Sequence, residues 1–186
     1  MTSNAFATPQ LFVTGRLVNA IGFDTEEIYI KYKIIIGDNF TLLNGVLSGE
    51  TFQAISNEEE GTNTINFDQP LNFNLKCDGI EGWPKIIFEV FSNDRDGRNC
   101  LIGYGTGYFP VKAGSSRLTI NCWRPSDSTK SSLSETFLGN NNEFLDISAV
   151  YTTLEKFGLN TISTGQINIE VDMIFKDFIL HGIDIN

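Results

Sequence analysis

Apolar and polar residues alternate along most of this chain, and the alternation predicts β-strands. The clearest case lies between Gln166 and Lys176, where Ile, Val, Met and Phe occupy every second position and mostly Asn, Glu and Asp stand between them. A strand of this kind buries one face and exposes the other. A period of two, or a short apolar run bounded by turn residues, predicts strands at 11–19, 27–36, 46–52, 71–77, 85–91, 101–109, 118–123 and 166–176. Turns rich in Gly, Asn and Asp separate them, so we expect an all-β fold, an eight-stranded antiparallel β-sandwich.

One stretch breaks this pattern. Residues 126–134 are rich in Ser and Thr, and Ser132 followed by Glu135 is typical of a capping box that starts a short helix, which Gly139 would end. The chain from there to Gly165 is long for a loop between two strands, and loops of that length often carry function. Two interpretations stay open for residues 140–165, the long excursion before the last strand: they cover one edge of the sandwich, or they dock a partner.

Composition and charge exclude several classes of protein. The 186 residues hold 23 Asp and Glu against 13 Lys and Arg, a formal net charge of −10, so we expect no nucleic-acid binding. The length suits one domain, placed at 11–180 between an N-terminal tail 1–10 and a C-terminal tail 181–186. No signal peptide or membrane-spanning apolar stretch is visible, which predicts a cytoplasmic protein. Three cysteines without CxxC spacing predict reduced thiols.

Motifs for catalysis and cofactor binding are missing. The single histidine, His181, stands near the end of the sequence, far from the rigid setting that a catalytic base needs. The glycines at 103, 105 and 107 do not make a phosphate-binding GxGxxG, because the third glycine would fall at Tyr108 and no helix follows. Alternate glycines in a strand indicate a bulge or the close approach of another segment. We therefore predict that the protein is not an enzyme and has no cofactor.

The loop that starts at Ser92 can be compared with the known kinds of calcium-binding loop. An EF-hand loop would need Glu at its twelfth position, which is Gly103. The strand and loop instead resemble those of calcium-dependent C2 domains, eight-stranded sandwiches whose loop reads D-x-D-x(5)-D-x-I-G. Here the three Asp positions hold Ser92, Asp94 and Cys100, and Glu27 stands where an earlier loop supplies Asp. Because Ca²⁺ takes roughly six to eight oxygen ligands, these positions predict a C2-like scaffold with a degenerate site and no bound metal.

Short motifs in order along nearly the whole chain resemble the B9-domain family. They are Gly15-Arg16-Leu17, Leu42-Leu43-Asn44-Gly45, Gly82-Trp83-Pro84-Lys85-Ile86, Gly103-Tyr104-Gly105, Trp123-Arg124-Pro125, Phe137-Leu138-Gly139, Ser163-Thr164-Gly165 and the tail from Phe178 to Gly182. The resemblance implies a non-enzymatic scaffold of the ciliary transition zone, at the cilium base or basal body, that supports cilium assembly and the diffusion barrier there. Its implied partners are B9 domain-containing protein 1 and homologues of the Meckel syndrome protein in the tectonic-like complex.

Four residues of these motifs are candidate partner contacts: Trp83, Pro84, Trp123 and Arg124. Each also has a structural explanation, because Pro holds the residue before it extended and an indole can cover a sheet edge. Arg124 could pair with an acidic neighbour in its own chain or with a carboxylate of a partner. The acidic loop 57–63 is expected to be solvated, or else to meet a basic partner.

A second function stays open, that of a peripheral lipid-binding C2-type module with weak or no calcium dependence and weak membrane association. The sequence supplies neither a calcium cage nor a basic groove for it. A glycan-binding sandwich is a third option, suggested by aromatic content alone.

Overall fold

The structure, a computed structural model, describes residues 8–59, 62–93, 97–126 and 160–182. Most of these residues lie in strands, which confirms the all-β prediction. The strands are β1 (Gln10–Ile21), β2 (Glu27–Ile35), β3 (Phe40–Gly45), β4 (Ser48–Glu50), β5 (Ala54–Ile55), β6 (Asn57–Glu59), β7 (Thr62–Cys77), β8 (Lys85–Asn93), β9 (Asn99–Tyr108), β10 (Gly114–Pro125) and β11 (Thr161–Lys176). A short 3₁₀ turn, η1 (Ile179–His181), follows β11. Among the described residues, no helix is long and apolar enough to cross a membrane.

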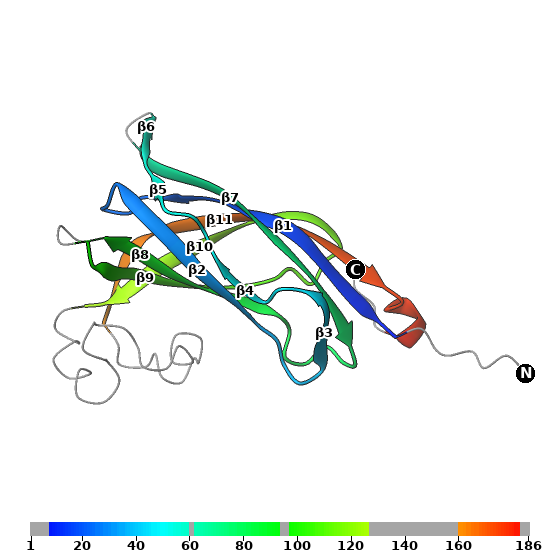
Figure 1. Cartoon of the computed structure of the whole chain (residues 1–186). Helices are drawn as coiled ribbons and strands as arrows, with labels where there is room; N and C mark the ends of the chain where they lie inside the picture. The colour runs from blue at the N-terminus through cyan, green and yellow to red at the C-terminus, as the bar shows by residue number, and fades with distance from the viewer. Residues whose placement is uncertain (1–7, 60–61, 94–96, 127–159, 183–186) are drawn as a thin grey trace, which may run out of the picture.

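The strands form one antiparallel sheet that curls into two layers (Figure 1). Their order is β3-β7-β1-β11-β10-β9-β8-β2-β4. β1 pairs with β11 from Gln10 to Ile21, whereas β10 and β9 are joined by two residue pairs, Cys122 with Gly105 and Trp123 with Tyr104. The sheet bends at this narrow junction, which places β3, β7, β1, β11 and β10 in one layer and β9, β8, β2 and β4 in the other. The predicted antiparallel sandwich is confirmed.

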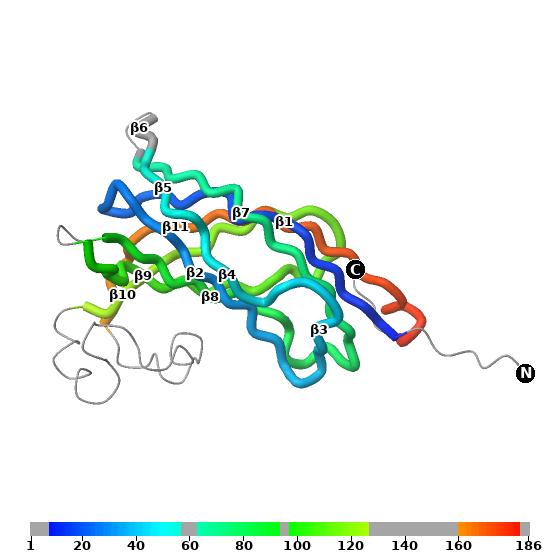
Figure 2. The backbone as a smooth tube through the Cα atoms, viewed as in Figure 1, coloured from blue at the N-terminus to red at the C-terminus, as the bar shows by residue number. Residues whose placement is uncertain are grey.

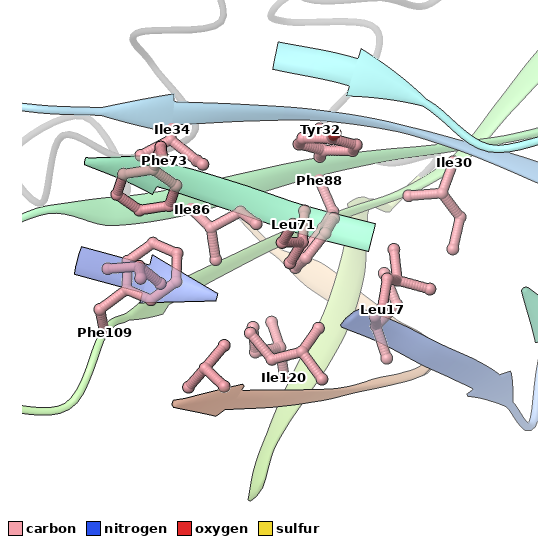
Figure 3. Packing of buried hydrophobic residues seen from close by; sticks show 14 of the residues in the cluster. Leu17, Ile30, Tyr32, Ile34, Leu71, Phe73, Ile86, Phe88, Phe109 and Ile120 are labelled. Atoms are coloured by element: carbon pink, nitrogen blue, oxygen red, sulfur yellow. The ribbon is translucent and has the colours of Figure 1, made fainter. Parts of the chain in front are cut away.

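The hydrophobic core fills the space between the layers. The inward residues predicted for the last strand, Ile167, Ile169 and Val171, are at most 2% exposed. They belong to one cluster with residues of β1, β2, β7, β8 and β10, including Leu17 of β1 and Phe88 of β8 (Figure 3). Each such side chain contributes about 1.5–3 kcal/mol when it leaves water. Burial of the apolar side chains in this alternation therefore supplies the main driving force for folding.

The glycines of β9 let a neighbouring strand pass close by. A Cβ atom at Gly105 would lie 3.0 Å from the Cys122 sulfur, and one at Gly107 would lie 2.6 Å from Ile120 Cδ1. The pairing of β9 with β8 also shifts register between Val90 and Phe91. Both expectations for these glycines, close approach and an irregularity in the ladder, therefore hold, and they explain how β9 and β10 meet at the bend.

Residues 40–56 close one side of the sandwich by crossing from one layer to the other (Figure 2). β3 pairs with β7, and the Val46 amide donates to Asn72 O of β7 at 3.4 Å. The next residue, Leu47, accepts a bond from Ile34 N of β2 at 2.6 Å. Thr51 then exchanges backbone and side-chain bonds with Ile30 of β2. Two successive residues thus bond to opposite layers.

Three local predictions need correction. A strand expected at 46–52 is shorter, as β4, and β3 before it was missed because five of its six residues are exposed and give no alternation. The loop expected at 57–63 is a hairpin in which β6 pairs with the start of β7. The last strand starts at Thr161, paired with Pro125 of β10, rather than at 166. The helix expected from Ser132, and residues 140–159 of the excursion, lie outside the described residues.

Candidate functional site

The positions of the degenerate calcium site gather at one end of the sandwich. Ser92 of β8 faces Cys100 of β9 across the ladder, and Glu27 opens β2 two residues before Tyr29, which pairs with Phe91. Ser92 is 7% exposed, whereas Cys100 and Glu27 are exposed. Asp94 lies outside the described residues, and those that are described contain no cluster of three or more potential metal ligands. The metal-free interpretation of this end stays a prediction.

Trp83 and Pro84 lie at the opposite end of β8 and pack inward. The indole Nε1 of Trp83 donates to Phe109 O at 2.9 Å. Its ring contacts the Phe40 ring edge-on at 5.7 Å between centroids and stacks with the Phe175 ring at 6.0 Å. Pro84 is buried. These contacts join β3, β8 and β11 at one end of the core. This is the arrangement expected if Trp83 and Pro84 have a structural role.

Trp123 belongs to a second apolar cluster on the outer face of β8 and β9. Ile87 and Tyr104 are each 1% exposed although they point away from the core cluster, and the Trp123 ring lies 5.8 Å from the Tyr104 ring. The sequence analysis missed this cluster. Its signal was the apolar run of β8, IIFEVF, because a strand buried on both faces reads as a continuous apolar run rather than as an alternation.

Arg124, the next residue, lines a small cleft of about 160 Å³. The cleft brings together two motifs that are far apart in the sequence, since Arg124 pairs with Ile162 in the β10–β11 ladder. Its lining residues are Phe23, Asp24, Thr25, Ile102, Arg124, Ile162, Ser163 and Thr164. The residue is exposed, and no ion pair joins Arg124 to another residue within the described ranges.

Two hydroxyl groups of this cleft also lack partners among the described residues. The Oγ1 atoms of Thr25 and Thr164 are buried, and neither has a hydrogen-bond partner in the described part of the chain. An exposed guanidinium can bind a carboxylate in a bidentate manner. Two alternatives were open for Arg124: pairing with an acidic residue of its own chain or with a carboxylate of a partner. Among the described residues no acidic side chain pairs with Arg124 or neutralises its charge.

The outer face of the other layer carries a charged ladder. Arg16 binds Glu170 at 3.0 Å and Asp68 at 2.9 Å, and Arg117 binds the second oxygen of Glu170. Hydrogen bonds from Arg117 and Arg16 lower the pKa of Glu170 below its usual value, and Glu170 raises the pKa of Arg16. This ladder links β10, β11, β1 and β7. Its charges pair with one another across the four strands at the surface.

The thiols and the histidine show no catalytic arrangement in the described parts. Cys77 and Cys122 are buried, and desolvation raises their thiol pKa to about 11 and about 12. A thiol with a raised pKa is a poor nucleophile at neutral pH. His181 lies exposed in η1, just after the last strand.

The fold defines the class of protein, and comparison with known proteins identifies the family. The chain is a C2-like antiparallel sandwich. The family model B9-C2, described as "Ciliary basal body-associated, B9 protein", matches residues 11–174. The chain therefore belongs to the B9 family, which confirms the resemblance seen in its motifs.

Similar curated proteins carry the names of two branches of this family. Human B9 domain-containing protein 2 is 27% identical over 175 residues, covering 94% of this chain and 98% of that protein. The Drosophila melanogaster protein of the same name is 26% identical with the same coverage. B9 domain-containing protein 1 of Xenopus laevis is 25% identical and covers 90% of this chain and 84% of that protein. Among solved structures, a C2 domain of plant Extended Synaptotagmin 1 aligns with a TM-score of 0.42 at 10% identity, over 87% of this chain and 92% of that one.

Proposed function

We propose that the protein is a non-enzymatic scaffold at the base of the cilium, which binds related B9-domain proteins and supports cilium assembly and the diffusion barrier. The observation that carries this proposal is the family match over residues 11–174, whose description places the family at the ciliary basal body. The partners we propose are B9 domain-containing protein 1 and homologues of the Meckel syndrome protein in the tectonic-like complex. The protein acts there as a single domain, residues 11–180, in the cytoplasm.

The cleft at Arg124 gives this proposal a contact point. The exposed Arg124 follows Trp123, so a partner carboxylate can bind its guanidinium without breaking an ion pair within the described residues. Pairs of this kind fix the register of an interface and reject partners of the wrong charge. Trp83 and Pro84 pack inward, and we propose that they stabilise the fold rather than contact the partner.

The proposal is tested by co-expressing the chain with B9 domain-containing protein 1 from the same organism and separating the products by size. We expect the two proteins to co-elute and the complex to unfold at a higher temperature than the chain alone, because a partner that binds only the folded state stabilises it. Arg124→Glu should weaken the complex by about tenfold or more. The matched control Lys112→Glu removes another exposed positive charge and should leave binding unchanged.

The lipid-binding alternative is tested in the same preparation. Vesicles containing phosphatidylserine are sedimented with the chain, with and without millimolar Ca²⁺. A scaffold without a calcium cage should stay in the supernatant in both cases. Sedimentation with the vesicles in either case, together with failure to co-elute with the related protein, would reverse the proposal.

A further inference from the structure

Two β-bulges meet at the cleft that Arg124 lines. The ladder between β10 and β11 skips Thr164, which is left as an extra residue on β11. The ladder between β8 and β9 skips Ile102 in the same way, and both extra residues line the cleft. A bulge re-aims the side chain of its extra residue, and bulges are common beside functional sites. The two bulges therefore bring a hydroxyl and an apolar side chain to one small space.

The residues that carry the two buried hydroxyls of the cleft are restrained by their neighbours. Thr164 Oγ1 lies over Gly103 of β9, where an added Cβ atom would lie 2.6 Å from it. In the loop between β1 and β2, Phe23 O and Thr25 O accept bonds from the Asn63 side-chain amide at 2.8 and 2.9 Å. The Oγ1 atoms of Thr25 and Thr164 have no hydrogen-bond partner among the described residues. Because a buried hydroxyl without a partner is costly, these two groups indicate a place for a polar ligand.

Two charged residues of opposite sign line the cleft, Asp24 and Arg124. Both are exposed, and among the ion pairs of the described residues none joins them to each other. Glu26 and Glu27, which follow Asp24, do not line the cleft, and neither does Arg98 just before β9. The cleft thus presents one positive group, one negative group and two hydroxyls. This set is complementary to a ligand that carries both charges.

Size and charge narrow the class of ligand. Pockets for cofactors and drug-sized molecules measure roughly 300–1,000 Å³, whereas this cleft measures about 160 Å³, so it suits a single amino-acid side chain. A phosphate dianion would meet one guanidinium beside one carboxylate, on a chain with a net charge of −10, and this balance disfavours a doubly charged anion. A carboxylate carries one charge, matches the fork of a guanidinium, and has lone pairs left for both hydroxyls.

We propose that the cleft binds an Asp or Glu side chain of a partner protein, adjacent in the partner's sequence to a Lys or Arg. Arg124 binds the carboxylate, the hydroxyls of Thr25 and Thr164 donate to it, and Asp24 pairs with the neighbouring basic group. The inference rests on the proposed function, in which a partner carboxylate contacts Arg124. It adds the two hydroxyls and Asp24 as the groups that determine which carboxylate is accepted.

Short peptides probe the cleft directly, by nuclear magnetic resonance titration of the isotope-labelled full chain. Three tetrapeptides with both ends blocked carry Asp-Lys, Asn-Lys or Asp-Gln between two glycines. We expect the Asp-Lys peptide to shift the amide signals of Thr25 and Thr164 and the Nε signal of Arg124. It should bind about tenfold or more tightly than the Asn-Lys peptide, and more tightly than the Asp-Gln peptide. A fourth peptide, Gly-Lys-Gly-Gly with a free C-terminal carboxylate, tests a chain terminus as the source of the carboxylate.

Three variants separate the roles of the lining groups. Thr25→Val and Thr164→Val each remove a hydroxyl with little change of shape. Both should unfold at the same temperature as the unchanged chain or higher, because neither hydroxyl has a partner among the described residues, and each should weaken the Asp-Lys peptide about fivefold or more. Asp24→Asn should remove the preference for Asp-Lys over Asp-Gln. The matched control is Thr119→Val, which removes a surface hydroxyl bonded to Asn168 at 2.7 Å and should leave peptide binding unchanged.

Other occupants of the cleft give different results. Equal binding of the Asp-Lys and Asn-Lys peptides, or unchanged binding by both Val variants, would overturn the inference and leave the hydroxyls to ordered water. Tighter binding of the peptide with the free C-terminus would overturn it in favour of a chain terminus. If no peptide binds and Arg124→Gln lowers the melting temperature of the isolated chain, the carboxylate belongs to the chain itself and the inference fails.

The same variants are tested for co-elution with B9 domain-containing protein 1. If that protein binds Thr164→Val and Asp24→Asn as well as it binds the unchanged chain, the proposed function stands and the inference about the cleft fails. If it does not bind at all while the peptides show the expected pattern, the cleft stands and the proposed partner fails.

Discussion

Replacing Trp83 separates a structural role from a role in partner binding. The Trp83 side chain makes one hydrogen bond, to Phe109 O at 2.9 Å, and two ring contacts, with Phe40 and Phe175. A neutral hydrogen bond contributes about 1 kcal/mol, and each aromatic pair adds about 0.5–1.5 kcal/mol to the apolar burial. Because the side chain is only partly buried, Trp83→Ala should cost about 3 kcal/mol, the lower end for such truncations.

For a chain of this size, about 1 kcal/mol shifts the melting temperature by roughly 2–4 °C. Trp83→Ala should therefore lower it by about 6–12 °C. Trp83→Phe keeps most ring contacts but loses the N–H donor, and should lower it by about 2–4 °C. Ile80→Ala is the control from the same loop, since Ile80 is 58% exposed and should change stability by less than about 0.5 kcal/mol.

The assay is thermal unfolding followed by far-ultraviolet circular dichroism, together with co-elution of each variant with B9 domain-containing protein 1. The structural explanation requires that Trp83→Ala melts early and that binding, measured below the melting temperature, is retained. If Trp83→Ala melts within about 1 °C of the unchanged chain and loses the partner, the reasoning is wrong and the indole is a partner contact.

Three further outcomes follow from the described contacts. Gly15→Ala should prevent stable folding or cost more than about 2 kcal/mol, measured by urea unfolding, because a Cβ there would lie 2.1 Å from the backbone O of Glu170 and force β1 and β11 apart. The lowered pKa of Glu170 contributes stability that is present above its usual value of 4.5 and is lost as pH falls through the lower pKa of the folded state; Glu170→Gln should shrink that acid dependence, and high salt should mask the difference because the group is exposed. Alkylation at pH 8 should label Cys100 quickly and leave Cys77 and Cys122 unlabelled until urea is added, as mass spectrometry of the intact chain would show; labelling of all three in the native state would contradict the burial of the latter two.

The long strands could be predicted from sequence because each buries one face, so that a period of two remains visible. β11 shows this most clearly, with Ile167 and Ile169 inward and Asn168 outward. β3 could not be predicted in the same way. Thr41 to Gly45 are all exposed, and the strand exists because it pairs with β7, a contact between segments that no local pattern encodes.

The sequence predicted which residues belong to the candidate site, but not how these residues are arranged in space. Trp83 and Trp123 stood out as motif residues of the same type, yet one packs among core aromatics and the other on the outer face. The cleft at Arg124 depends on the register that sets Arg124 opposite Ile162. Register between distant strands is decided by all their side chains together, so single motifs could not reveal which of them would meet.

Two consecutive residues, Val46 and Leu47, connect both layers of the molecule, since the Val46 amide bonds to β7 and the Leu47 carbonyl to β2. Any contact that restrains β3 would therefore also restrain the opposite layer through the backbone itself, and would be seen as slower exchange of the amide hydrogens of β2.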